Sequence, residues 1–287
     1  MSHLNKKAME VKRILFPTDF SEPTENALPF LLNLAKKTNS EVVFFNAFAI
    51  PEMITDLPYD AIEKEVEVLE VNSSRQLNDL VDRVREYEPD VKLTILSRAG
   101  SFSTELKNVI EEYDIGLVLM ATKGVDGIVP GIFGTHAAHV IEKVRCPVIV
   151  IPQQTTLRTV KNIVFASEYH EEDLDTIKFL ARLAAYFEAT LTIVNVYSEN
   201  LILERLKTNE FQLMVEEMVV YHGLRFKYIK GDDAFQALRD YVEENSVDLL
   251  AMTTHHKGMF KRLFEGSMTR KMVSKGNAPI MAFHSVE

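Results

Sequence analysis

Short runs of consecutive apolar, mostly β-branched residues alternate along this chain with longer segments in which apolar residues recur every three to four positions. The runs are typical of strands buried on both faces of a sheet, and the longer segments are typical of helices with one apolar face. In the first half the runs predict strands at Val11–Phe16, Glu41–Phe48, Val91–Ser97, Ile115–Ala121 and Pro147–Ile151. This alternation predicts an α/β fold with a parallel sheet covered by helices on both faces.

Two helical segments of the first half have a clear apolar face. The members of the first face are Leu28, Leu31, Leu32 and Ala35, and those of the second, within Ala61–Glu88, are Leu77, Leu80, Val81 and Val84. Their three- and four-residue spacing places each set on one side of a helix. We expect both faces to pack on the sheet.

The whole pattern occurs twice. Arg13–Asp19 matches Asn162–Glu168, and Val42–Asn46 matches Leu191–Asn195, both at an offset of 149 residues. Three later blocks match at an offset of 132 residues: Ile115–Met120 with Val247–Met252, Ile132–Thr135 with Phe264–Ser267, and Cys146–Ile149 with Ala278–Met281. Such a repeat predicts two domains, residues 1–155 and 156–287, each with a five-stranded parallel sheet. The change of offset predicts a longer connection in the first half, between Asn46 and Gly100.

Composition and charge indicate which binding partners are disfavoured and which cellular compartment is expected. The 287 residues carry a formal net charge of -10, which disfavours binding to nucleic acid or to an anionic membrane. Cys146 is the only cysteine, so no internal disulfide can form, as in proteins of reducing compartments. The N-terminal residues lack the apolar core of a signal peptide, and the longest apolar stretches are too short to span a bilayer. We expect a cytoplasmic protein.

Candidate chemistry follows the first and fourth predicted strands, because ligands of such sheets bind at the carboxyl ends of the strands. Pro17–Ser21 comes after the first strand, where Pro17 is expected to end the strand and Asp19 is a good helix-capping residue. Ala121–Gly124 comes after the fourth strand, and Gly134 and Thr135 then open a helix. Free N–H groups at that helix start would favour a phosphate at Thr135 and His136.

These segments resemble the universal stress protein family. Ile14–Ser21 reads I-L-F-P-T-D-F-S, which is similar to the family's opening motif. Ala121, Gly124, Gly134 and Thr135 stand at the four positions of the G-x2-G-x9-G-(S/T) motif of its ATP-binding members, with only the first glycine changed. The resemblance covers nearly the whole chain in two copies. It implies tandem Rossmann-like domains of the adenine-nucleotide-hydrolase-like type that bind ATP, with or without Mg²⁺.

The resemblance also implies a role for each matching residue. Asp19 would meet the adenine, helped by the backbone of Pro17 and Thr18, and Ala47 would line the base. The ribose and phosphates would be held by Ala121, Gly124, Gly134, Thr135 and His136. Ala121 departs from the motif because it adds a methyl group where the family's backbone approaches the ligand.

The second half departs further from the same motifs. Its candidate residues, which stand at the matching positions, are Glu168, Val196, Thr253, His256, Gly266 and Ser267. The extra methylene of Glu168 and the imidazole of His256 would both intrude on a nucleotide. We therefore expect weak binding or none in this half.

Other interpretations of the same residues stay open. Asp19 could act only as a helix cap, and Gly134 with Thr135 could form only a turn and a cap. His255 and His256 fit no standard zinc spacing, so no metal site is expected from side chains alone. The apolar connection Ile50–Asp60 could cover the first pocket, form a partner surface or pack in the core.

Three functions are compatible with these observations. The leading one is a stress-response module that binds an adenine nucleotide, the second is an interaction scaffold without nucleotide, and the third is a slow ATPase. Because universal stress proteins usually pair through their last strands, the resemblance implies that Val148–Ile151 and Ile280–Phe283 pair in an internal pseudo-dimer. A homodimer of whole chains is left open.

Overall fold

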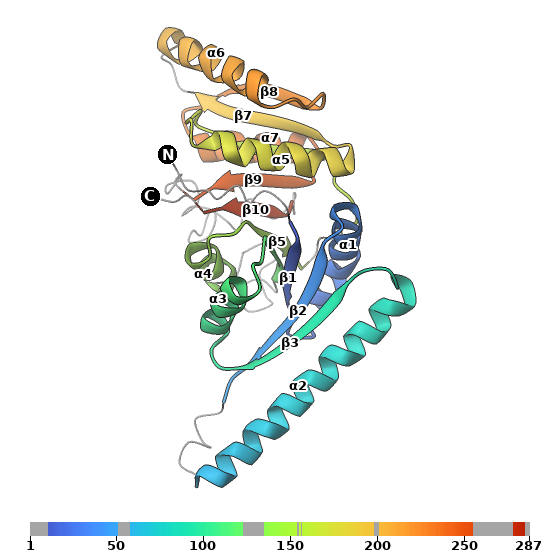
Figure 1. Ribbon diagram of the computed structural model, residues 1–287. Helices are drawn as coiled ribbons and strands as arrows, with labels where there is room; N and C mark the ends of the chain where they lie inside the picture. Colours follow the sequence, from blue (N-terminus) through green and yellow to red (C-terminus); the bar gives the residue numbers. More distant parts are fainter. Residues whose placement is uncertain are drawn as a thin grey trace.

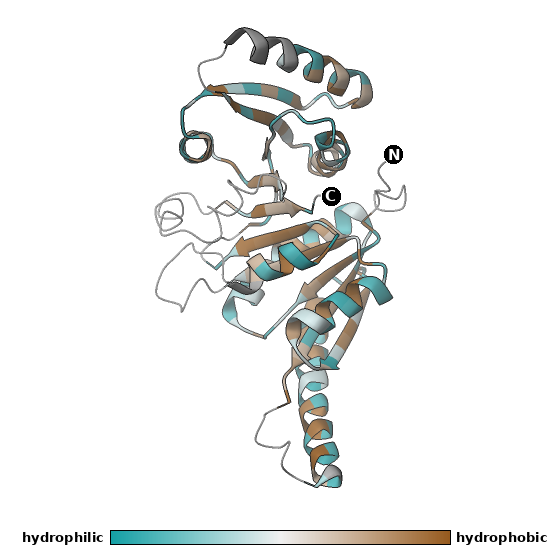
Figure 2. Ribbon diagram, turned by 90° about the vertical axis from the view of Figure 1, so that its left-hand side faces the viewer, coloured by the Kyte–Doolittle hydropathy of each residue, from teal (hydrophilic) through white to brown (hydrophobic). Residues whose placement is uncertain are grey.

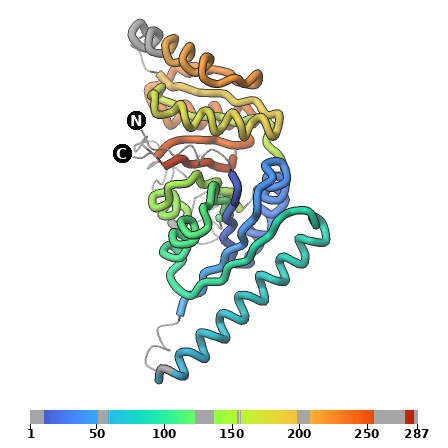
Figure 3. The backbone as a smooth tube through the Cα atoms, in the orientation of Figure 1, coloured from blue at the N-terminus to red at the C-terminus, as the bar shows by residue number. Residues whose placement is uncertain are grey.

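One ten-stranded sheet forms the centre of the protein, in the order β3-β2-β1-β4-β5-β10-β9-β6-β7-β8. The computed structural model describes residues 11–50, 58–122, 135–153, 155, 157–197, 201–254 and 278–284. Each half of the chain contributes five consecutive strands of this order, and the two halves occupy opposite ends of the molecule (Figures 1 and 3). The predicted α/β fold with two tandem five-stranded parallel units is therefore confirmed, and the two units share one continuous sheet.

The first half contains the predicted alternation of strands and helices. Its strands are β1 (Arg13–Pro17), β2 (Glu41–Phe48), β3 (Leu93–Ala99), β4 (Leu117–Thr122) and β5 (Val148–Pro152). Its helices are α1 (Glu22–Thr38), α2 (Tyr59–Tyr87), α3 (Phe102–Glu112) and α4 (Thr135–Lys143). Each strand lies within two residues of the position that the apolar runs predicted.

The second half repeats this order. Its strands are β6 (Asn162–Ala166), β7 (Thr190–Tyr197), β8 (Leu224–Lys230), β9 (Leu249–Thr253) and β10 (Ile280–Phe283), and its described helices are α5 (Asp173–Phe187), α6 (Leu201–Met218) and α7 (Ala234–Glu244). Helix α2 is longer than its counterpart α6, as the change of repeat offset predicted. In Figures 1 and 2 the N-terminal part of α2 projects beyond the sheet. Residues 51–57 of the apolar connection before it lie outside the described residues.

Apolar side chains fill both faces of the sheet. Helices α1, α2, α5 and α6 pack on one face, and α3, α4 and α7 pack on the other. The strands are apolar along most of their length, whereas the helices present polar residues outward (Figure 2). Leu31 and Ala35 of α1 and Leu77 and Val84 of α2 are buried, so both predicted helix faces pack on the sheet as expected.

The structure shows how β1 ends and α1 begins. Strand β1 ends at Pro17, one residue beyond the predicted bound, and Pro17 still pairs with Phe45 of β2. The pairing of β1 with β4 already ends at Leu15, so the N–H that proline lacks is not needed there. The alternative that Asp19 acts only as the cap of α1 does not hold, because the N-cap residue is Ser21, with a proline in the first turn that follows.

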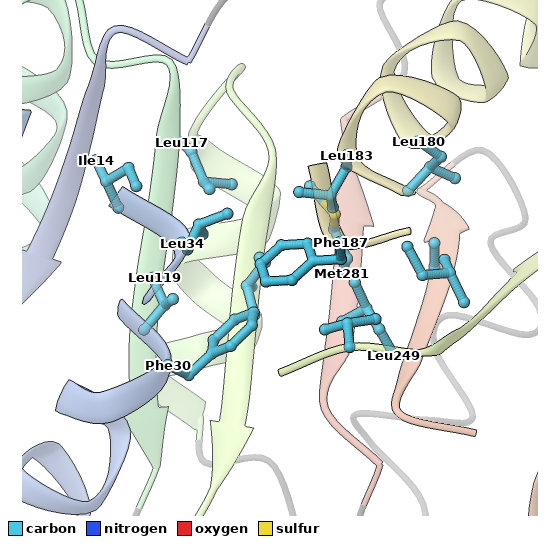
Figure 4. Packing of buried hydrophobic residues seen from close by; sticks show 14 of the residues in the cluster. Ile14, Phe30, Leu34, Leu117, Leu119, Leu180, Leu183, Phe187, Leu249 and Met281 are labelled. Carbon is cyan, nitrogen blue, oxygen red and sulfur yellow. The ribbon is translucent and has the colours of Figure 1, made fainter. Parts of the chain in front are cut away.

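The two halves meet through their last strands. Strand β10 pairs antiparallel with β5, with Ile280 opposite Val150 and Ala282 opposite Val148. Next to this pairing, the ring of Phe30 in α1 stacks on that of Phe187 in α5 with 6.0 Å between centroids. Figure 4 shows these rings between leucines of both halves. The predicted internal pairing is confirmed, and it makes the carboxyl ends of the two parallel units point in opposite directions.

No helix in the described parts of the chain combines the length and the apolar character that crossing a membrane requires.

Candidate functional site

The candidate site of the first half lies where the winding direction of the sheet reverses. Strand β1 is flanked by β2 on one side and by β4 on the other. The chain winds from β1 through β2 to β3 in one direction and reaches β4 and β5 in the other. Crevices that hold ligands in open α/β sheets form at this point, outside the carboxyl ends of the strands.

A tight turn fixes the backbone directly after β1. The N–H of Thr18 donates to the carbonyl of Phe45 at 2.8 Å, which extends the pairing of β1 with β2 by one residue. The N–H of Phe20 donates to Oγ1 of Thr18 at 2.9 Å, and Phe20 has a φ of 59°. Because Thr18 is buried, this turn anchors the residue between them, Asp19, at the rim of the sheet.

Asp19 presents its carboxylate at the surface of this rim. Its side chain is exposed, and Oδ1 accepts hydrogen bonds from the N–H of Ser21, at 3.1 Å, and from the Ser21 hydroxyl. A carboxylate has acceptor capacity for further donors after these two bonds. It can therefore accept hydrogen bonds from amino or hydroxyl groups of a ligand at the edge of the crevice.

Three hydrogen-bonded polar side chains, which the motifs did not include, hold the carbonyl of Thr18 in this turn. The side-chain amide of Asn46 donates to the carbonyl of Thr18 at 2.8 Å, and its Oδ1 accepts from the Ser73 hydroxyl of α2 at 2.8 Å. The Ser97 hydroxyl of β3 donates in turn to Ser73 at 2.7 Å. Asparagine stands at both Asn46 and Asn195, 149 residues apart, so the repeat contained a signal that could have identified it.

The other predicted residues of the first half lie at the same edge where the structure describes them. Ala47 is near the end of β2, and Ala121 is near the end of β4, opposite Ile151 of β5. Helix α4 begins at Thr135, as predicted, with His136 as its second residue. A helix start offers unpaired N–H groups and the positive end of the helix dipole. Gly124 and Gly134 lie outside the described residues.

The second half forms the same turn with different side chains. The N–H of Tyr169 donates to Oγ of Ser167 at 2.9 Å, and Tyr169 has a φ of 62°. The side chain of Asn195 donates to the carbonyl of Ser167 at 3.0 Å. Glu168 takes the place of Asp19, and its carboxylate lies 3.5 Å from Nε2 of His170. The partner of the acidic residue has thus changed from a serine to a histidine.

Aromatic residues replace the polar chain of the first half. Tyr228 lies opposite Asn195 in the sheet, as Ser97 lies opposite Asn46. The ring of Tyr169 stacks on Phe211 of α6 at 4.6 Å and meets the edge of Tyr228 at 5.9 Å. Burial, together with the neighbouring Tyr228, raises the pKa of Tyr169, so the phenol stays neutral. Asn195 still donates to the turn, but the residues behind it are aromatic where the first half has Ser73 and Ser97.

The remaining second-half candidates are only partly described. Val196 is partly buried near the end of β7, and Thr253 is buried at the end of β9. His256, Gly266 and Ser267 lie outside the described residues, as does His255. Thr253 carries a branched side chain at the position where the first half has Ala121.

The chain's cysteine is a poor nucleophile in this structure. Burial raises the pKa of the Cys146 thiol to about 12, so almost none of it is thiolate at neutral pH. Among the residues that the structure describes, no group of three or more His, Cys, Asp or Glu side chains is arranged to hold a metal ion.

Comparisons with known proteins agree with the repeat. The sequence model of the Universal stress protein family matches residues 10–152 and 226–284. A universal stress protein of Synechocystis sp. is 24% identical over 310 aligned positions, which cover 95% of this chain and 100% of the relative. A universal stress protein of Methanocaldococcus jannaschii is 26% identical over 140 residues, which cover 49% of this chain and 81% of the relative.

A solved structure shows the same fold over the whole chain. The crystal structure of a universal stress protein from Archaeoglobus fulgidus superposes with a TM-score of 0.68 at 16% identity. The superposition covers 97% of this chain and 98% of that one. The likeness therefore includes both halves and the sheet that joins them.

Proposed function

The chain belongs to the universal stress protein family, and we propose that its first half binds ATP or a related adenine nucleotide, so that the protein acts as a cytoplasmic stress-response module. The observation that carries the proposal is the turn after β1, which anchors Asp19 at the switch point of the sheet. The proposed boundary between the nucleotide-binding domain and its degenerate second copy lies between residues 155 and 156.

Asp19 and the start of α4 suit the two ends of such a ligand. The exposed carboxylate of Asp19 can accept hydrogen bonds from the amino group or sugar of the nucleoside. Helix α4, which follows β4, begins at Thr135, and unpaired N–H groups at a helix start favour phosphate oxygens. In our proposal Pro17, Thr18 and Ala47 contact the base, and Ala121, Gly124, Gly134, Thr135 and His136 hold the ribose and phosphates.

We propose that the second half binds nucleotide weakly or not at all. Glu168 is longer than Asp19 and lies beside His170, and the polar support of the turn is replaced by Tyr169, Phe211 and Tyr228. The positions of Val196, Thr253, His256, Gly266 and Ser267 would then serve the structure of this half rather than a ligand.

Calorimetric titration with ATP and Mg²⁺ tests this proposal. We expect wild-type protein to bind about one nucleotide per chain. Asp19→Ala should weaken binding about tenfold or more, because a hydrogen bond to a charged group contributes about 1.5–3 kcal/mol. Glu168→Ala changes the matching residue of the second half and should leave the affinity unchanged, which makes it the control.

Three other outcomes would change the assignment. A second nucleotide per chain, lost in Glu168→Ala, would mean that the second half is also a site. Absence of binding at millimolar ATP would refute the proposal and favour an interaction scaffold, which the substitution of the motif's first glycine by Ala121 and Thr253 also favours. Release of inorganic phosphate during the titration would identify a slow ATPase.

A further inference from the structure

A cavity between the two halves has no role in the function proposed above. It lies between the C-terminal end of α1, the residues that lead into β1, and α5 of the second half, and its volume is about 440 Å³. Pockets for small molecules have volumes of roughly 300–1,000 Å³. Lys12, which lines the cavity, directly precedes β1, whereas Asp19 follows β1. The cavity therefore lies at the amino end of this strand and the Asp19 site lies at its carboxyl end.

Arg182 of α5 is an unsatisfied cation in this cavity. Its Nε and Nη2 atoms are shielded from solvent and have no hydrogen-bond partner among the residues that the structure describes. Buried donors without a partner are rare and cost free energy, so a guanidinium in this state indicates an acceptor that the described part of the chain does not provide. Nε and an Nη atom together form the planar pair of donors that binds two oxygens of one anion.

A second cation and an apolar floor complete the lining. Lys12 lines the same cavity and is exposed, and no described acidic residue forms an ion pair with it or with Arg182. Phe179 and Leu183 are buried beneath them. Helix α1 ends at Thr38, with Asn39 as its C-cap, and the roughly half negative charge of a helix C-terminus is outweighed by two full positive charges. The cavity thus combines a net positive charge with an apolar wall.

The residue that matches Arg182 in the first half has a hydrogen-bond acceptor. Asn33 of α1 stands 149 residues before Arg182, and its amide donates to the carbonyl of Arg158 at 2.7 Å. The segment between the two halves therefore provides the acceptor for Asn33. Arg182 is longer, is charged and finds no such acceptor in the described segments of the chain, so the two positions have diverged in chemistry.

We propose that this cavity binds a phosphate-bearing small molecule: the Arg182 side chain, which lines the cavity, turns its covered guanidinium nitrogens toward the ligand and donates to two phosphate oxygens, and Lys12 neutralises the second charge. A dianion matches the two cations, and the rest of the ligand packs on Phe179 and Leu183. Because the site is built from α1 and α5, the ligand contacts both halves and stabilises their junction. This site is independent of the nucleotide site at Asp19.

Thermal unfolding in inorganic phosphate tests the proposal. At equal ionic strength, phosphate should raise the melting temperature of the wild-type protein more than chloride or acetate does, because a ligand that binds the folded state stabilises it. Arg182→Gln and Lys12→Gln should each weaken phosphate binding about tenfold or more. Lys161→Gln changes the lysine that stands 149 residues after Lys12 and should respond as wild type.

The outcomes are separable from those of the nucleotide site. If Arg182→Gln fails to fold, Lys12→Gln decides the question because its side chain is exposed. ATP affinity should be unchanged in Lys12→Gln. If this variant lost affinity for both phosphate and ATP, the phosphate effect would belong to the nucleotide site, and the proposal would be overturned. An equal response of Lys12→Gln and Lys161→Gln, or an equal effect of acetate and phosphate, would also overturn it.

Discussion

The side-chain amide of Asn46 donates a hydrogen bond of 2.8 Å to the backbone carbonyl of Thr18, and so ties the end of β2 to the turn that holds Asp19. The second half contains the same bond, from Asn195 to Ser167 at 3.0 Å. Its presence in both halves indicates that it belongs to the fold. In the first half it also fixes the proposed site.

We predict that Asn46→Ala lowers the free energy of unfolding by about 1–3 kcal/mol, because the carbonyl of Thr18 loses a partly buried donor. The turn would also lose its support, so ATP affinity should fall. Urea denaturation and calorimetry measure the two effects. Asn195→Ala is the matched control, with a similar loss of stability and no change in ATP affinity. Equal losses of affinity in both variants would contradict this separation of roles.

The junction between the halves depends on apolar packing around Phe187. This ring is buried and stacks on Phe30 of the other half. We predict that Phe187→Ala lowers the free energy of unfolding by about 3–5 kcal/mol, the cost of removing a buried phenyl ring. Tyr87→Ala, at a side chain that is 78% exposed, should change it by about 0.5 kcal/mol or less. A small effect of Phe187→Ala in urea denaturation would show that the halves are held by the β5–β10 pairing alone.

The buried elements could be predicted from the sequence because burial leaves a pattern. The run around Val42–Phe45 is apolar at every position because both faces of β2 are covered, and the repeat then predicted which strands would pair between the halves. Strand β1 includes Pro17, one residue beyond the predicted bound, for a geometric reason. A proline is excluded only where its N–H is required, and that depends on where the neighbouring strand stops pairing.

Features that depend on tertiary contacts were not predictable. Asp19 is as good a helix cap as Ser21 by residue type, and the choice between them follows from the turn that Thr18 and Phe20 form. Likewise, Arg182 is an ordinary helix residue in the sequence. Only the packing of α5 near the end of α1 leaves its Nε and Nη2 without a partner among the described residues.

Stability should depend on pH through Glu41 at the start of β2. Hydrogen bonds from Thr94, at 2.6 Å, and from Arg13, at 2.9 Å, lower the pKa of Glu41 below its ordinary value of 4.5. The unfolded chain therefore binds this proton more readily, so the contribution is present above about pH 4.5 and is lost as the pH falls through the lowered pKa.

We predict that Glu41→Gln lowers the free energy of unfolding by on the order of 1 kcal/mol at neutral pH, a modest amount because the ion pair is partly exposed. The difference from wild type should shrink as the pH falls below about 4.5. Urea denaturation at a series of pH values measures it, with Glu86→Gln on the exposed side of α2 as the control. A difference that persists unchanged into acid would mean that the effect of Glu41 does not depend on its charge.

Cys146 provides a test of the interpretation that this protein has no thiol chemistry. Burial raises the pKa of its thiol from 9.0 to about 12, so the thiolate, which is the reactive form, should be about a thousandfold scarcer than for a free thiol at the same pH. We predict that iodoacetamide modifies Cys146 in the folded protein slower by about that factor than in urea-unfolded protein, as mass spectrometry would measure. Because thiolate remains scarce until the pH nears 12, the folded rate should rise about tenfold per pH unit throughout the range from 7 to 9. Rapid modification of the folded protein at pH 7 would instead identify an activated cysteine, and would reopen the assignment of this chain as a binding module.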